Sequence, residues 1–207
     1  MPRDEINRRS VLKQLGVVAA GGTTLAAAGS EAAEARQLEA QYYGREQLLE
    51  AFHTHGAGLP AALSEAGVVD ETFGFGDVAF ELDPEVRGME PTEEDGLAGV
   101  TVTATDGPRT AVGMISTSTD GHEVALFVQP ERNEAYAIVE SADDGDRFVV
   151  TDDGSVEPLG CAYYSCTCER CYNPNGVMYY VEEYYECTAD CTSCWLEDTS
   201  CVCTSCS

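Results

Sequence analysis

The most concentrated chemistry in this sequence is a set of thiols near its C-terminus. All ten cysteines of the 207-residue chain lie in this segment, Cys161 first and then the runs CTCERC (166–171), CTADCTSC (187–194) and CVCTSC (201–206). Thiols at this density either form disulfides or bind metal, because so short a segment buries too little apolar surface to fold unaided. The choice depends on the compartment, since disulfides persist outside the reducing cytosol.

The N-terminus indicates export. Arg8 and Arg9 open the run RRSVLK, which matches the twin-arginine type of signal, and a weakly apolar stretch (11–28) and small residues follow it. The stretch is short for a membrane helix, which needs about 20 apolar residues. We therefore expect residues 1–30 to be a cleaved signal peptide, and the protein to be secreted by the twin-arginine pathway with no stable membrane span. An ordinary N-terminal helix with two arginines is the alternative.

Export favours the disulfide interpretation, and ten cysteines fit five bridges. The predicted disulfide residues are Cys161, Cys166, Cys168, Cys171, Cys187, Cys191, Cys194, Cys201, Cys203 and Cys206. The alternative is zinc held by thiolates from the set Cys166, Cys168, Cys171, Cys187, Cys191, Cys194, Cys201, Cys203 and Cys206. Against zinc, the segment has no histidine and CxC steps are rare in single-zinc sites. We therefore expect no cofactor, and zinc is the alternative.

The charge balance excludes some partners. The formal net charge is −26, and Lys13 is the only lysine. A dense carboxylate surface with almost no lysine is typical of a salt-loving microbe, where concentrated salt screens the self-repulsion. An acidic secreted protein of another origin is the alternative. On either interpretation the chain repels nucleic acid, because phosphate binding requires clustered basic side chains.

The apolar pattern predicts an α+β fold. Leu38, Tyr42, Leu49 and Phe52 recur at helical spacing within 31–56, and a short second helix is expected over 61–66. From about residue 99, β-branched runs separated by Asp-Gly steps predict an antiparallel β-meander. We therefore expect an acidic domain over 31–157, helix first and meander after.

A small disulfide-rich tail is expected over 158–207. Within it, VMYYVEEYYE (177–186) places apolar and tyrosine side chains on one helical face and favours a helix, although its residue types also allow a strand.

No catalytic constellation stands out. The sequence has no GxSxG, P-loop or HExxH motif, and its carboxylates are spread as on a salt-adapted surface. His53 and His55 are a possible pair of metal ligands, but their position at a predicted helix end favours ordinary surface residues. We predict that the protein is not an enzyme.

The whole layout resembles the precursors of haloarchaeal peptide antibiotics of the halocin C-eight type, the microhalocins. The twin-arginine signal at Arg8 and Arg9, the acidic middle domain and the ten C-terminal cysteines in CxxC-like steps carry the resemblance. It implies a secreted precursor whose Cys-rich tail (158–207) is cut off as a bacteriocin-like antimicrobial peptide. It also implies that the middle domain (31–157) binds its own tail as an immunity protein, and that the tail's target is an unidentified component of the target-cell envelope.

A secreted structural or binding module is the other interpretation. In it, a disulfide- or zinc-stabilised knob binds a partner and has no killing activity. The tyrosine pairs of the tail suit this role, since tyrosine offers contact area at a low cost in conformational entropy.

The signal can be tested by replacing Arg8 and Arg9 with lysine. We expect the variant to accumulate unprocessed inside the cell, because the twin-arginine route requires both arginines. Immunoblots of cells and medium measure the distribution, with Arg36→Lys, beyond the signal, as the control. Undiminished secretion of the double variant would contradict the assignment.

Overall fold

A computed structural model describes residues 24–91, 94–103, 109–119, 121–172, 176–188 and 191–205, with the side chains of 24–32, Cys168 and Glu169 excepted. The predicted export residues Arg8 and Arg9 lie outside the described residues, as does Cys206.

Strands are the main secondary structure of the described chain. Nine strands hydrogen-bond in their order along the sequence. They are β1 (Glu81–Leu82), β2 (Leu97–Thr103), β3 (Thr110–Thr119), β4 (His122–Gln129), β5 (Glu134–Ser141), β6 (Arg147–Thr151), β7 (Val156–Tyr172), β8 (Met178–Thr188) and β9 (Cys194–Cys203). The β1–β2 pair is parallel and every other pair is antiparallel, so the sheet is mixed. Gly121 and Gly145, with φ of 103° and 73°, lie in turns that reverse the chain between strands.

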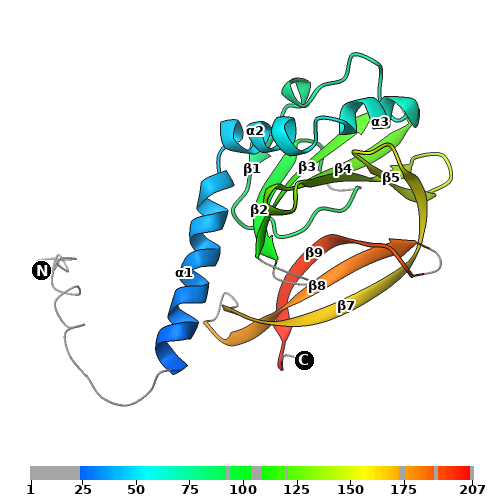
Figure 1. The fold of residues 1–207 in the computed structure, drawn as a ribbon. Helices are drawn as coiled ribbons and strands as arrows, with labels where there is room; N and C mark the ends of the chain where they lie inside the picture. The colour runs from blue at the N-terminus through cyan, green and yellow to red at the C-terminus, as the bar shows by residue number, and fades with distance from the viewer. Residues whose placement is uncertain are drawn as a thin grey trace, which may run out of the picture.

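Helices α2 (Arg45–His55) and α3 (Leu59–Glu65) cover one face of β2–β6, and α1 (Thr24–Tyr42) runs down the side of the molecule (Figure 1). The short 3₁₀ turns η2 (Phe75–Asp77) and η3 (Pro130–Arg132) lie in the connections. Phe52 and Leu63 pack with alternate strand residues such as Leu126 and Val128 in the first core. None of the helices in the described ranges is both long and apolar enough to cross a bilayer.

The Cys-rich strands cover the opposite face, so the molecule has three layers (Figure 1). The second core joins Met114 and Phe127 of β2–β6, which we call the first sheet, to Trp195 and Leu196 of β9. Strand β7 connects the layers, because its first residues pair with β6 (Val150 opposite Val156) and the rest pairs with β8. We call β7–β9 the Cys-rich sheet.

The predicted fold class, α+β with an N-terminal helix and an antiparallel β-meander followed by a small disulfide-rich tail, is wrong, although the C-terminal region is disulfide-rich. The chain is mostly β, and its tail continues the same mixed sheet as three long strands. The helix expected over 177–186 is part of strand β8, where the tyrosines of β8 pair with those of β7: Tyr163 stacks on Tyr185 with ring centroids 4.9 Å apart. Such cross-strand aromatic pairs stabilise a sheet and have no equivalent in an isolated helix. The helix expected over 31–56 is two helices, because the chain breaks at Tyr43 and Gly44.

Disulfides hold the Cys-rich sheet together. Four are described: Cys161–Cys191, Cys166–Cys203, Cys171–Cys201 and Cys187–Cys194. Two of them join β7 to β9 across the intervening β8, with Cα atoms 5.9 and 5.7 Å apart. Strands two places apart in a flat sheet are about 10 Å apart, so this sheet is strongly curled. A disulfide-rich C-terminal segment, as predicted, is confirmed, and four disulfides fit a secreted Cys-rich protein.

Peptide mapping of the oxidised protein should recover these four pairs. We also expect the fifth bridge predicted from the even count, which by elimination joins Cys168 to Cys206. Non-reducing digestion and mass spectrometry measure the pairs, and the intact mass should lie about ten hydrogens below that of the reduced chain, two for each bridge. A sample treated with a phosphine reductant serves as the control. Alkylation of any of these thiols without reductant would contradict the prediction.

Candidate functional site

The candidate site is the face on which the Cys-rich sheet packs against β2–β6, which we call the docking face. Its apolar part is built around Phe127 and Tyr136, whose rings stack with centroids 4.9 Å apart. Tyr185 of β8 and Trp195 and Leu196 of β9 pack against them and are buried. These residues bury large aromatic and aliphatic surface, so the docking face is a true core.

Hydrogen bonds fix the position of β9 on this face. The Tyr136 hydroxyl, fully buried, donates to the backbone oxygen of Leu196 at 2.6 Å. The Thr199 hydroxyl donates to the backbone oxygen of Arg87 at 2.9 Å. A buried polar group without a hydrogen-bond partner is costly. A shift of β9 along the docking face would break these bonds, so they fix its register.

The loop before β2 also contacts β9 closely. The Met89 amide donates to the Glu197 backbone oxygen at 3.0 Å. Next to it, Gly88 lies so close to Asp198 that a Cβ atom would overlap the aspartate backbone. A glycine is therefore required for this approach.

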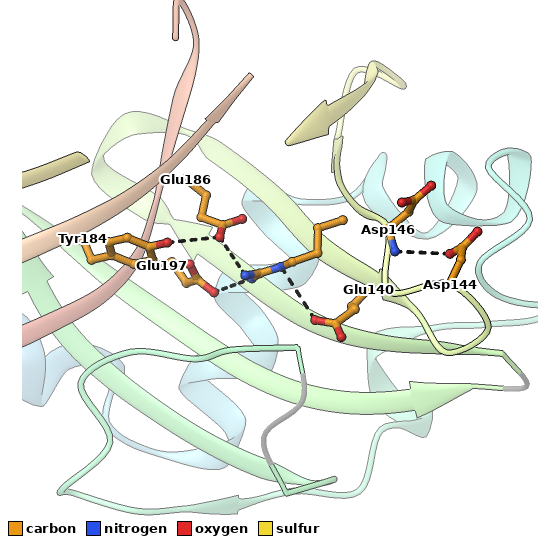
Figure 2. Close-up of polar contacts among 7 residues, drawn as sticks. Glu140, Asp144, Asp146, Tyr184, Glu186 and Glu197 are labelled. Atoms are coloured by element: carbon orange, nitrogen blue, oxygen red, sulfur yellow. Dashed lines mark hydrogen bonds and ion pairs between the residues drawn. The ribbon is translucent and has the colours of Figure 1, made fainter. Parts of the chain in front are cut away.

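An ion cluster lies at the edge of the docking face (Figure 2). Arg147 is the first residue of β6, and Glu140 is its directly opposite partner on β5. The guanidinium contacts three carboxylates: Glu186 of β8 at 2.7 Å, Glu197 of β9 at 2.5 Å and Glu140 at 3.8 Å. The cluster thus joins the Cys-rich sheet to the first sheet by charge-assisted hydrogen bonds.

The turn before β6 positions the arginine. Asp144 accepts a hydrogen bond from the Asp146 amide at 3.2 Å, which closes the turn from β5 (Figure 2). A hydrogen bond with the Ser141 side chain and this bond with the Asp146 amide lower the pKa of the exposed Asp144 carboxyl. The turn therefore presents Arg147 toward β8 and β9 as the strand begins.

Burial and neighbouring charge shift the titration of the cluster. Burial raises the pKa of the Glu197 carboxyl to about 7, and the hydrogen bond and charge of Arg147 offset this only in part. Burial alone would lower the pKa of Arg147, but its hydrogen bond to Glu197 and the surrounding carboxylates raise it. Burial and the charges of Glu186 and Glu197 raise the pKa of Tyr184 to about 12, so its hydroxyl stays protonated and donates to Glu186 at 3.2 Å.

A cavity of about 220 Å³ lies next to the cluster. Its lining residues are Glu90, Arg147, Tyr164, Glu182, Tyr184, Asp198 and Ser200. The polar and mostly acidic lining suits water or a small cation better than an apolar ligand.

The structure places the metal-ligand candidates from the sequence at separate positions. His55 lies within 3.0 Å of the Asn133 side chain, and the His53 ring packs edge-on against Phe75, so the two histidines make separate structural contacts. For the zinc alternative, Cys166, Cys203 and Glu182 are the one group of potential ligands among the described residues, with ligand atoms within 4.8 Å of one another. The two sulfurs are bonded to each other, so a zinc site here would require the reduced chain.

Sequence reasoning missed the ion cluster. Arg147, Glu186 and Glu197 come from three strands and have no characteristic spacing. The available signal was the position of Arg147 at the head of the apolar run RFVV, in a chain where every basic side chain but one is an arginine. A lone cation beside a buried strand requires a carboxylate partner.

Comparison with known proteins gives no match. No family model, no curated protein and no solved structure matches the chain. The resemblance to halocin precursors therefore stays a prediction from the sequence.

Proposed function

We propose that this protein is a secreted two-part precursor. In it, residues 31–157 bind and restrain the Cys-rich segment 158–207, which on release is an antimicrobial peptide of the halocin C-eight type. The proposal adopts the layout implied by the sequence resemblance, with export by the twin-arginine route. The docking face is the structural counterpart of the restraint.

The distribution of cross-links is the observation that carries the proposal. Every described disulfide joins two residues within the Cys-rich segment. The described contacts that hold this segment to 31–157 include the apolar docking face, its hydrogen bonds, the Arg147 ion cluster and the pairing of β7 with β6, all of them noncovalent. One cut in the connecting chain would therefore convert a covalent attachment into a dissociable complex.

The connection between the parts is accessible to a protease. Residues 153–155 are exposed and lie in the turn between β6 and β7, where the Thr151 amide donates to the Ser155 backbone oxygen at 3.0 Å. Exposed turns are the preferred sites of proteolytic cutting. The cut would fall outside the disulfide-linked segment, because the first cysteine, Cys161, comes later.

The docking face supports a masking role for residues 31–157. Tyr185, Trp195 and Leu196 are buried against the first sheet, and they would become exposed in a released peptide. An exposed apolar patch of this kind promotes binding to proteins or membranes. Restraint and activity would then use the same surface, so that bound peptide is inactive.

A second candidate function is a binding module that keeps both parts together. Tyr164 and Tyr172 of β7 are 66% and 65% exposed, and Val202 of β9 is 52% exposed. Exposed aromatic and aliphatic side chains on a rigid, cross-linked sheet suit recognition of a partner. On this view the docking face has only a structural role.

The two functions are distinguished by cutting the folded chain. A specific protease site inserted between Gly154 and Ser155 allows the oxidised full-length protein to be cut once. We expect the two parts to stay associated in size-exclusion chromatography at high salt, because the docking face is unchanged. After separation in denaturant and removal of the denaturant, the Cys-rich part that begins at Ser155 should inhibit the growth of related salt-loving microbes, and the part that ends at Gly154 should relieve the inhibition.

The uncut chain, and a cut chain whose Cys-rich part has been reduced and alkylated, are the controls. Growth of every strain in the presence of correctly oxidised Cys-rich part would reject the antimicrobial function and favour the binding module. A cut chain that dissociates at once would reject the restraint.

A further inference from the structure

The ion cluster holds more negative charge than its arginine can balance. Glu197 and Glu186 are 1% and 8% exposed, and both face the single guanidinium of Arg147. The second carboxylate oxygens of Glu186 and Glu197 have no hydrogen-bond partner among the described residues. A buried charge without a partner is costly, so one of the two carboxylates is stabilised by taking up a proton.

The groups around Glu197 indicate that this carboxylate holds the proton. The neighbours are Arg147 of β6, Glu140 of β5, Tyr184 and Glu186 of β8, and Glu90 of the loop before β2. Only the arginine is positive, Tyr184 is a neutral donor to Glu186, and Glu140 keeps 27% of its side chain in solvent. Glu197 is the most deeply buried carboxylate of the cluster, and its second oxygen has no donor within the described ranges, so the proton belongs there.

We infer that the cluster of Arg147, Glu186 and Glu197 is a proton-dependent latch, which holds the Cys-rich sheet on residues 31–157 most tightly when Glu197 is protonated and loosens when Glu197 loses its proton. As a device that controls release, the latch rests on the proposed restraint. The effect of Glu197 protonation on docking does not depend on that restraint, because it follows from the burial of Glu197 at the docking face.

The sign of the effect follows from the two states of Glu197. In the docked chain its pKa is about 7, whereas the ordinary value, expected once the sheet separates, is 4.5. Docking therefore takes up a proton, and the added stability is fully present below about pH 4.5 and lost as the pH rises through about 7. Between pH 6 and pH 8 the docking equilibrium should weaken about tenfold.

The proton linkage is tested in the uncut, oxidised full-length chain. Trp195 is the only tryptophan and is 8% exposed at the docking face, so its fluorescence reports unfolding of this region. Denaturant titrations at pH 6 and pH 8 at constant salt give the unfolding equilibrium constant. We expect this constant to rise about tenfold more in the wild type than in Glu197→Gln, which mimics the protonated carboxyl.

Glu140→Gln is the matched control. It makes the same chemical change beside the same arginine, but on the 31–157 side and at a more exposed side chain, so it should keep the wild-type pH dependence. An equal pH dependence in wild type and Glu197→Gln would overturn the latch. If Glu197→Gln does not fold, the ¹³C resonance of the Glu197 carboxyl in the wild type decides instead, and titration near its ordinary value would overturn the latch.

The cut chain separates failure of the latch from failure of the restraint. We expect the dissociation constant of the two parts to be about tenfold larger at pH 8 than at pH 6. Tight association with no pH dependence would overturn the latch and leave the restraint standing. Dissociation at both pH values would overturn the restraint, and the titrations of the uncut chain would still decide the proton linkage.

Discussion

The structure depends on burying both faces of one sheet. Strands β3 to β5 carry apolar side chains on both sides, with Leu126 and Val128 facing the helices and Phe127 facing the Cys-rich sheet. A strand buried on both faces needs two covering layers, and this chain builds the second from its cysteine-rich end. The position of the ion cluster, the need for a glycine at residue 88 and the burial of Trp195 all follow from this packing.

The disulfides and the docking face have different structural roles. The disulfides restrict the unfolded states of the Cys-rich segment and make its own fold less dependent on a large apolar core. The docking face instead fixes where that segment lies, through Tyr136, the β9 backbone and Arg147. Internal stability and attachment thus come from separate interactions, as a protein needs if one of its parts is to leave intact.

Local features of the fold could be predicted from the sequence. Glycine marks the end of α2 at Gly56, and the steps before Gly121 and Gly145 mark turns, because these conformations depend on a few neighbouring residues. The layering could not be predicted in this way, because it depends on contacts between residues far apart. The apolar runs VALFV and AYAIV were the available signal, since they lack the polar alternation of a strand with one face in solvent. The ion cluster joins three strands and depends on that layering.

The curling of the Cys-rich sheet also bears on self-association. Strand β9 ends the strand order and would ordinarily present unpaired amides and carbonyls to other molecules. Its first half instead meets Met89 and the Tyr136 hydroxyl, and its second half is drawn toward β7 by the bridges at Cys201 and Cys203. In concentrated salt, where charge repulsion between acidic molecules is screened, such shielding of an edge strand keeps neighbouring copies from adding strands to one another.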